Sequence, residues 1–440
     1  MNFPKSPHKR NQANVLLVTM CVIAIVMLFI IPTIFFMTST QNLSVTRSHS
    51  WNAALAAAEA GVEEALAHLN TSIMFAKAQR ASQGWTFSDG FYRAPRRTLS
   101  DGCSYEVKFS DDPQPEIFST GYATVPLKST TLSRSVMVTT SNAPLFVNGM
   151  TAQTTIDFKG GIETDSYNSK DPNFSTNGKY DPAKARDHGD VATNSGITNS
   201  LSLGNAKIKG HLRTGSAGQP KLGPLGSVGD TAWVDGGYTY IKPGWLVDDM
   251  NMEFPDVLAP AATTTPVGGT VGGTNYTYVL SQLANDDGYI LNTLNMKSND
   301  KMLVTAGAKA VLYVTGDVLM QGKSFIQIDT GATLQIFVGG TDATFTEVNT
   351  SGKAENFQYF GLPSNTSVTW GGNAEYVGTI YAPSATFTMG GGGSSDYDFQ
   401  GACIVYSIVM NGHFKFHFDE SLPDYTQLTR GLVAVTWTEQ

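Results

Sequence analysis

An uncharged apolar run near the start of the chain constrains its fold more than any other feature. The run extends from Val15 to Met37, roughly 23 residues, and no charged residue occurs between Arg10 and Arg47. A helix of that length crosses the hydrocarbon core of a bilayer, whereas a helix of a soluble core would carry a polar face. We therefore expect residues 13–37 to form a transmembrane helix, which Pro32 kinks.

The charges on either side of this run predict its orientation. Lys5, Lys9 and Arg10 lie just before it, and the nearest cation after it is Arg47. The positive-inside rule then places residues 1–12 in the cytoplasm as a basic tail and the rest of the chain on the other side. A cleaved secretory signal is the alternative, but the apolar region of such a signal is shorter, about 7–15 residues. We expect a single-pass inner-membrane protein with a periplasmic or surface-exposed ectodomain.

Residues 38–70 are expected to continue the same helix in amphipathic form. The segment AALAAAEAGVEEALAHLN is rich in alanine, the strongest helix former. Its larger apolar residues recur at offsets of seven, four and three, which places them on one stripe: Leu55, Val62, Leu66 and Leu69. This stripe must pack either on the chain's own globular domain or on neighbouring copies.

The remaining chain reads as a mainly β protein. It contains 44 glycines and only 15% charged residues, a profile of many strands and tight turns. Within residues 71–142, three segments alternate as strands do: Ser104–Phe109, Glu116–Ala123 and Leu132–Thr140. We expect them to form a small antiparallel β segment.

From residue 143 to residue 440, short β runs alternate with Gly and Asn turns. The stretches Gly378–Ala382 and Gly401–Val405 resemble each other about 23 residues apart, and Thr386–Gly390 and Ser407–Gly412 repeat likewise. A loose period of about 20 residues indicates a stacked β-solenoid. Residues 255–300 are expected to be an irregular excursion from it, and the strand-like tail 431–439 is expected to cap it.

Two parts of the chain resemble bacterial envelope proteins. The basic start, the apolar span and AAAEAGVEEAL (Lys9 to Leu69) are similar to the N-terminal region of PilX-type minor pilins and type IV pilus assembly proteins. Stretches such as Asp165–Ser169, Gly378–Pro383 and Phe416–Glu420 resemble the right-handed parallel β-helix ectodomain often found behind such N-termini.

These resemblances imply a membrane-anchored, pilin-like subunit that displays a solenoid for adhesion or protein contacts. They also imply that the helix around Leu55, Val62, Leu66 and Leu69 packs against pilus or secretion-fibre subunits, and that Val15 to Met37 contacts lipid. The rival hypothesis is a membrane-tethered protein that binds or cleaves polysaccharide.

Because β-solenoids include glycan-cleaving enzymes, clusters of polar residues in this part of the chain are candidate catalytic sites. The strongest polar cluster is Arg186-Asp187-His188-Gly189-Asp190, but it reads as a solvated loop, since proximity in sequence does not set catalytic geometry. A second set near the end resembles a metal site, but strand alternation places only two of its members, His413 and His417, on one face; the others are Asp419 and Glu420. A structural role is the preferred interpretation.

Candidate ligand sites are weaker. Residues 171–181 offer many oxygen atoms, but the glycine is misplaced for an EF-hand loop. A run of aromatics is a candidate carbohydrate platform, although packing is the preferred interpretation: Trp233, Tyr238, Tyr240 and Trp245. The Gly390–Gly393 run lacks the Lys of a phosphate loop. We expect no catalytic, cofactor-binding or metal-ligating residues.

Charge and cysteine usage narrow the function further. A net charge of −8 argues against nucleic-acid binding, which needs a basic patch. The three cysteines, Cys21, Cys103 and Cys403, are far apart and form no zinc-binding pattern. Whether Cys103 and Cys403 meet depends on the fold.

Overall fold

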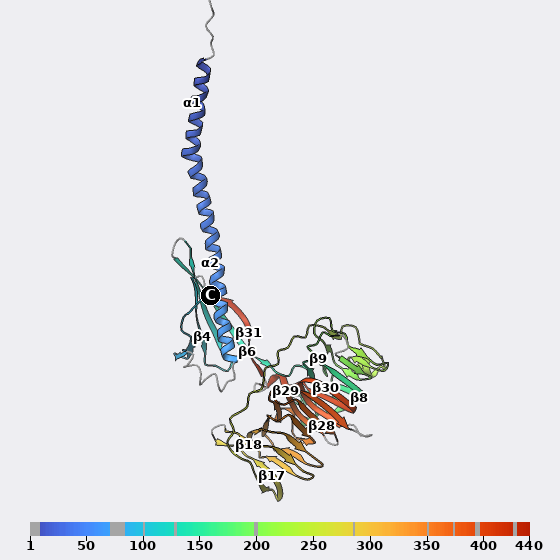
Figure 1. Ribbon diagram of the computed structural model, residues 1–440. Helices are drawn as coiled ribbons and strands as arrows, with labels where there is room; N and C mark the ends of the chain where they lie inside the picture. The colour runs from blue at the N-terminus through green and yellow to red at the C-terminus, as the bar shows by residue number, and fades with distance from the viewer. Residues whose placement is uncertain are drawn as a thin grey trace, which may run out of the picture. The chain divides into compact units, whose positions relative to one another are not determined.

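The chain forms two compact units. The computed structural model describes residues 9–70, 84–99, 102–126, 130–197, 201–284, 287–349, 352–372, 375–391, 397–425 and 429–440. Residues 1–143 and 431–440 make up the helix-and-sheet unit, and residues 144–430 make up the coiled unit. The predicted fold class, a mainly β chain behind one long apolar helix, is confirmed (Figure 1).

The N-terminal helix is continuous through the predicted span and the amphipathic segment. It comprises α1 (Lys9–Ile25), a π-helical turn (Val26–Ile30) and α2 (Ile31–Asn70). In the π turn the Ile31 amide donates to the Val26 carbonyl, one residue further back than in an α-helix. Pro32 follows directly and has no amide hydrogen to donate, so the helix accommodates it by this local change of hydrogen bonding.

An antiparallel sheet covers one side of α2. Its strand order is β1-β2-β4-β5-β6-β31, and β3 pairs with β4. The strands are β1 (Thr86–Ser88), β2 (Phe91–Arg93), β3 (Arg97–Thr98), β4 (Cys103–Ser110), β5 (Glu116–Val125), β6 (Thr130–Pro144) and β31 (Thr429–Glu439). The three predicted strands lie within β4, β5 and β6, so that prediction is confirmed.

Small residues, rather than the predicted leucines, form the centre of the helix–sheet contact. The buried positions of the lower half of α2 include Ala54, Ala57, Ala58, Gly61 and Ala65. Val62 is buried too, but Leu55, Leu66 and Leu69 are only partly buried at the margins of the same core. The stripe therefore packs at least in part on the chain's own sheet, and contact of these four residues with other subunits stays a prediction.

Glycines allow the helix backbone to lie unusually close to β5. A Cβ on Gly121 would lie 2.0 Å from the Ala54 carbonyl oxygen, and one on Gly61 would lie 2.2 Å from the Ser119 hydroxyl. No side chain fits at that distance, so both positions need glycine. The contact excludes water along the helix and gives the unit a tightly packed core.

The C-terminal strand returns to this first unit. We expected residues 431–439 to cap the solenoid, but β31 pairs beside β6 in the helix-and-sheet unit. Contacts such as Arg134 with Glu439 and Thr139 with Thr436 run in opposite order along the two strands, so they are antiparallel. The coiled unit is thus inserted between two neighbouring strands, and the predicted solenoid boundary at residue 440 is wrong.

The coiled unit consists of many short strands. They are β7 (Met150–Ala152), β8 (Ile156–Tyr167), β9 (Val191–Thr193), β10 (Leu201–Gly204), β11 (Lys207–Lys209), β12 (Leu212–Arg213), β13 (Lys221–Leu222), β14 (Ser227–Gly229), β15 (Leu246–Val247), β16 (Val267–Val271), β17 (Thr274–Leu280), β18 (Tyr289–Leu291), β19 (Leu294–Met296), β20 (Lys301–Val304), β21 (Lys309–Val314), β22 (Val318–Met320), β23 (Phe325–Ile328), β24 (Thr333–Val338), β25 (Asp342–Phe345), β26 (Glu347–Val348), β27 (Phe357–Gly361), β28 (Ser367–Gly372), β29 (Tyr376–Gly391) and β30 (Tyr397–Asp419). One short helix, α4 (Thr231–Asp235), and the 3-10 turns Pro182–Lys184, Ala354–Asn356 and Leu422–Asp424 complete the described elements.

Every third strand stacks in parallel on the one three before it. β17 pairs with β20 and β20 with β23, while β18, β21 and β24 form a second series and β19, β22 and β25 a third. One pass of three strands therefore makes one coil. Alternate residues of a strand point inward: Leu334, Ile336 and Val338 of β24 are buried and stack on β27. The right-handed winding implied by the resemblance stays a prediction.

The sequence repeats lie directly against each other. Gly378 pairs with Gly401, Ile380 with Cys403, and Phe387 with Ile408 across β29 and β30. The register shifts between Ala382 and Thr386, which is where the repeat spacing changes from about 23 to about 21 residues. The spacing in the sequence is therefore the length of a coil.

The first and the last strands of the coiled unit lie next to each other in the stack. β30, the last strand, pairs in parallel with β8, one of the first, from Ile408 with Ile156 to Asp419 with Tyr167. The chain therefore enters and leaves the coiled unit at neighbouring coils. That arrangement suits an insertion, because both connections to the helix-and-sheet unit start from one place.

The predicted excursion near 255–300 is only partly irregular. Residues 248–263 contain no strand, but β16 and β17 form an antiparallel hairpin, and β17 to β19 form a coil. Gly272 and Gly273 both have positive φ, 58° and 79°, as a two-residue hairpin turn requires. The Gly-Gly pair between two Thr/Val/Tyr-rich runs was the signal for this turn.

Candidate functional site

The apolar half of the N-terminal helix presents a continuous series of exposed apolar side chains. The large apolar side chains of Val15–Met37 are between 37% and 77% exposed. It is the one helix in the described part of the chain that is long and apolar enough to cross a membrane. Figure 1 shows it extending beyond the sheet that covers its lower half. Exposed apolar surface of this extent marks a lipid or protein contact.

Several threonine hydroxyls along the helix donate to carbonyl groups of the helix itself. Thr33 donates to the Phe29 carbonyl at 2.6 Å, and Thr38 donates to the Ile34 carbonyl at 2.9 Å. Thr40 and Thr46 make the same bond one turn back. These threonines therefore add little polar cost in lipid or in a helix–helix contact, because their donors already have acceptors.

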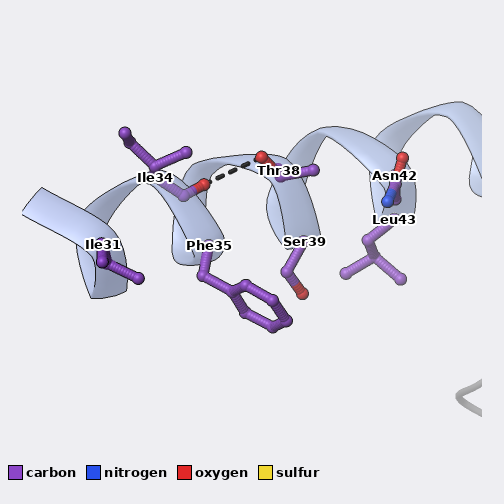
Figure 2. Close-up of a pocket in the computed structure, with 7 residues that line it drawn as sticks. All are labelled: Ile31, Ile34, Phe35, Thr38, Ser39, Asn42 and Leu43. Carbon is purple, nitrogen blue, oxygen red and sulfur yellow. Dashed lines mark hydrogen bonds between the residues drawn. The ribbon is translucent and has the colours of Figure 1, made fainter.

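A shallow hollow lies on one face of the helix where the apolar run ends. Ile31, Ile34, Phe35, Thr38, Ser39, Asn42 and Leu43 line it, and its volume is about 540 Å³. Figure 2 shows Ile31, Phe35, Ser39 and Leu43 pointing to the same side. Offsets of three and four residues are those by which one helix receives the side chains of another. Since a single helix lines the hollow, it suits a neighbouring helix and not an enclosed small ligand.

A partly buried ionic cluster fixes the lower half of α2 to the sheet. The Arg97 guanidinium donates to Glu64 of α2 at 2.8 Å and 3.1 Å, and the Tyr105 hydroxyl donates to the same carboxylate at 2.7 Å. Burial and the bond to Glu64 raise the pKa of Tyr105 to about 12. The bond to Glu64 also raises the pKa of Arg97. Tyr105 therefore stays neutral and Arg97 stays charged at neutral pH.

In the coiled unit, the structure joins the two polar sets that looked separate in the sequence. Arg186 donates to Glu420 at 2.6 Å, and His188 Nδ1 lies 3.0 Å from the same carboxylate. Ser166 also donates to Glu420, at 2.6 Å. The bond to Glu420 raises the pKa of His188. Burial tends to raise the pKa of Glu420, but His188, Ser166 and Arg186 together lower it.

The two acids of the first set are engaged in structural bonds. Asp190 accepts from the His211 amide at 2.8 Å and lies 3.5 Å from the Arg213 guanidinium. Asp187 accepts from the Thr231 amide at 3.3 Å. The solvated-loop interpretation is therefore incomplete, because these side chains tie neighbouring coils together.

The second candidate set, near the end of the coiled unit, is divided between solvent and the protein interior. His413 is exposed, whereas His417 is buried, stacks on Tyr180 at 3.5 Å and contacts the Asp165 carboxylate. Asp419 is fully buried, accepts from the Ser169 amide at 3.0 Å, and burial raises its pKa. Among the described residues no group of three or more His, Cys, Asp or Glu is placed to hold a metal.

Asp165 and Tyr180 were not recognised from the sequence. Parallel pairing sets His417 beside Asp165 although some 250 residues separate them. The only signal in the sequence for the contact between Asp165 and His417 was that both lie in stretches that resemble β-helical ectodomains, Asp165–Ser169 and Phe416–Glu420.

The loop Asp171–Asp181 binds its own backbone. Asp171 Oδ1 accepts from the Asn173 amide at 2.9 Å, and Asp181 Oδ1 accepts from the Ala183 amide at 3.0 Å. Each bond reaches two residues along the chain, as in Asx turns. These carboxylates stabilise turns and do not converge on one point.

The predicted aromatic run is a cluster in the structure. Trp233 stacks on Tyr238 with 4.2 Å between ring centroids, and Tyr240 meets Trp233 edge-on at 4.9 Å. Trp245 stacks separately on His211 at 4.3 Å. Tyr238 and Tyr240 are 48% and 52% exposed, so packing alone, the preferred interpretation, does not describe them.

The cysteines are free thiols. Cys103 is partly buried in β4, and Cys403 is buried in β30. Burial raises the pKa of the Cys403 thiol well above its usual value, so it acts as a small apolar side chain.

A domain family and a solved structure resemble this chain. Residues 273–425, less than half of the chain, match a domain family described as a domain of unknown function (DUF7305). A comparison with curated proteins finds no match. Among solved structures, the chain is similar to the competence-associated pilin ComZ from Thermus thermophilus, with 10% identity, a TM-score of 0.31, and 89% of this chain and 97% of that chain covered. At that TM-score the likeness carries no weight.

Proposed function

We propose that this chain is a non-enzymatic, pilin-like envelope protein: a minor pilin or an assembly component of a type IV pilus or related secretion fibre. The observation that carries the proposal is the division of its N-terminal helix. The apolar part, Val15–Met37, is bare, while the lower part of α2 packs on its own sheet. A helix built in this way anchors a folded head in a bilayer and can later pack against other helices.

The insertion supports a display role. The coiled unit enters after β6 and leaves before β31, two strands that pair in the helix-and-sheet unit. Two covalent connections hold the coiled unit, so it can be presented without a long single linker. We further propose the orientation given by the positive-inside rule, with the N-terminus in the cytoplasm and both units outside.

The bonds of the coiled unit's acids favour a non-catalytic role over glycan cleavage. Asp187 and Asp190, the candidate acids, hold backbone amides of other segments, and Glu420 is paired with Arg186. A catalytic acid or base needs a site beside it for a reacting atom. The rival predicts glycan cleavage that Asp187→Asn or Asp190→Asn abolishes.

Mechanical shearing of intact cells tests the proposal. We expect the full-length protein to be recovered with sheared surface fibres, or in the inner membrane if it is an assembly factor. A variant with Cys21→Ala and Ser39→Cys places a single new thiol in the hollow of Figure 2. Mild oxidation should link it to a neighbouring helix that carries a cysteine at the same depth.

The matched control is Ser88→Cys on β1, which is also exposed but lies on the sheet. Equal cross-linking from both positions would argue against helix-directed contacts. Recovery of the protein in the soluble fraction would overturn both anchoring and assembly.

A further inference from the structure

We propose that Tyr238 and Tyr240, with Trp233 behind them, form a binding platform for a neutral polysaccharide. The inference rests on the proposed display of the coiled unit and names its ligand class. Binding is measured on the isolated full-length protein, so a failure of binding and a failure of fibre assembly are distinguishable.

The platform is held in place by a short, well-fixed segment. Asp230 Oδ1 accepts from the Trp233 amide at 2.9 Å and starts the single turn α4. The Trp233 indole donates to the Tyr240 carbonyl at 3.2 Å. A Cβ on Gly229 would lie 2.8 Å from the Trp233 ring, so glycine there lets the indole lie on the strand. The rings therefore need little reordering to receive a ligand.

The rings form an open corner. One face of Tyr238 rests on Trp233, with planes 17° apart, and the ring of Tyr240 stands at 82° to Tyr238 with 6.3 Å between centroids. About half of each tyrosine is exposed. Tyrosines placed only to close the end of a coil would be covered, whereas these two leave about half of their surface open to solvent.

Polar groups of both signs surround the corner. Asp235 pairs with Lys209 at 2.9 Å, and Lys242 pairs with Asp230. Lys242 also lies 5.6 Å from the Trp245 ring. Because Lys209 and Lys242 each have a carboxylate partner, these two lysines leave no excess positive charge to select an anionic ligand.

An aromatic face beside paired polar groups matches the chemistry of a sugar ring. The C–H face of a pyranose packs on an aromatic ring, and its hydroxyls exchange hydrogen bonds with carboxylates and ammonium groups at the edge. Equatorially substituted β-1,4-linked hexoses present flat C–H faces, so we expect them to bind best. Tyrosine suits this role because it loses little conformational entropy on binding.

The test is calorimetric titration of the full-length protein in a detergent without a sugar headgroup. The probes are cellotetraose, chitotetraose and the α-linked maltotetraose. We expect a β-1,4-linked tetrasaccharide to bind more tightly than maltotetraose. Tyr238→Ala should weaken that binding by about ten-fold, as expected for the loss of one stacking surface. Tyr238→Phe should bind nearly as well as the unmodified protein, because it keeps the ring.

The matched control is Tyr406→Ala, which removes a tyrosine on β30 that is 44% exposed and lies outside the cluster. It should leave binding unchanged. Tyr240→Ala should weaken tetrasaccharide binding independently of Tyr238→Ala. A thermal melt of each variant shows that it is folded. The proposal is overturned if none of the three probes binds, if both alanine variants bind normally, or if Tyr406→Ala weakens binding equally.

Discussion

Asn70, the last residue of α2, makes hydrogen bonds with both backbone groups of Leu432. Its Nδ2 donates to the Leu432 carbonyl at 2.9 Å, and its Oδ1 accepts from the Leu432 amide at 2.6 Å. The two residues are 362 positions apart, and the whole coiled unit lies between them in the sequence. This pair fixes the point at which the chain re-enters the helix-and-sheet unit.

Replacing Asn70 should loosen the returning strand. Asn70→Ala removes both bonds, and because the site is exposed we expect a loss of about 1 kcal/mol in the free energy of unfolding of the helix-and-sheet unit. Amide hydrogen exchange along β31 measures the effect directly. Asn70→Asp keeps the acceptor and should exchange at an intermediate rate. Unchanged exchange in Asn70→Ala would show that the edge pairing with β6 alone holds β31.

The close approach of α2 and β5 should not tolerate a methyl group. Gly121→Ala places a Cβ 2.0 Å from the Ala54 carbonyl, and we expect a loss of about 1–3 kcal/mol in the stability of the helix-and-sheet unit. Thermal unfolding followed by near-ultraviolet circular dichroism reports it. The control is Gly371→Ala, where nothing lies within 4 Å of the new Cβ. Equal melting of the two variants would contradict this packing.

Removing the carboxylate of Glu64 should weaken the attachment of the helix. Glu64→Gln leaves Arg97 and Tyr105 without their charged acceptor, and since Arg97 is partly exposed we expect a loss of about 1 kcal/mol. Urea unfolding gives the change in free energy. Glu63→Gln alters the neighbouring exposed carboxylate and should be neutral. Equal loss from both variants would point to a general charge effect.

A cation in the middle of the apolar run should impair anchoring. Val26→Lys places a charge near the bilayer centre, at a cost of about 3 kcal/mol on insertion scales. We expect more of this variant than of the unmodified protein to be released when membranes are washed with alkaline carbonate. Ser39→Lys lies beyond the apolar run and should remain membrane-bound. Normal retention of Val26→Lys would argue against a membrane-spanning helix.

The contact between His188 and Glu420 predicts a pH dependence of the coiled unit. The bond to Glu420 raises the pKa of His188 in the folded protein. The stabilisation that protonated His188 gives the coiled unit is therefore complete below about pH 6.5, the pKa of histidine in the unfolded chain, and is lost as the pH rises through the pKa of the folded protein. The pKa of Glu420 is lowered overall in the folded protein. The stabilisation that ionised Glu420 gives the coiled unit is therefore complete above about pH 4.5, the pKa of glutamate in the unfolded chain, and is lost as the pH falls through the pKa of the folded protein.

The two contributions coincide between about pH 4.5 and pH 6.5. Because His188 is about half exposed, we expect the change above that window to be well below 1 kcal/mol. Melting temperatures of the unmodified protein and His188→Gln at pH 6 and pH 8 measure it. The difference between the two proteins should be larger at pH 6, and a larger difference at pH 8 would contradict the assigned charge states.

The sequence by itself determined the features that depend on local pattern. The apolar run gives the exposed helix, alternation gives β4, β5 and β6, and the repeat of Gly378–Ala382 in Gly401–Val405 gives the coil length, because stacked coils must place similar residues in register. Each of these follows from the period of side chains along a helix, a strand or a coil.

Only the tertiary structure decided which distant segments meet. β31 pairs with β6 and not with the coils, His417 lies beside Asp165, and Glu420 joins Arg186. It also decided that small residues of α2, and not its leucines, form the centre of the contact between helix and sheet, since Gly121 of β5 sets how closely the helix approaches. Such pairings depend on how hundreds of residues stack between the partners, and no local period of the sequence encodes that.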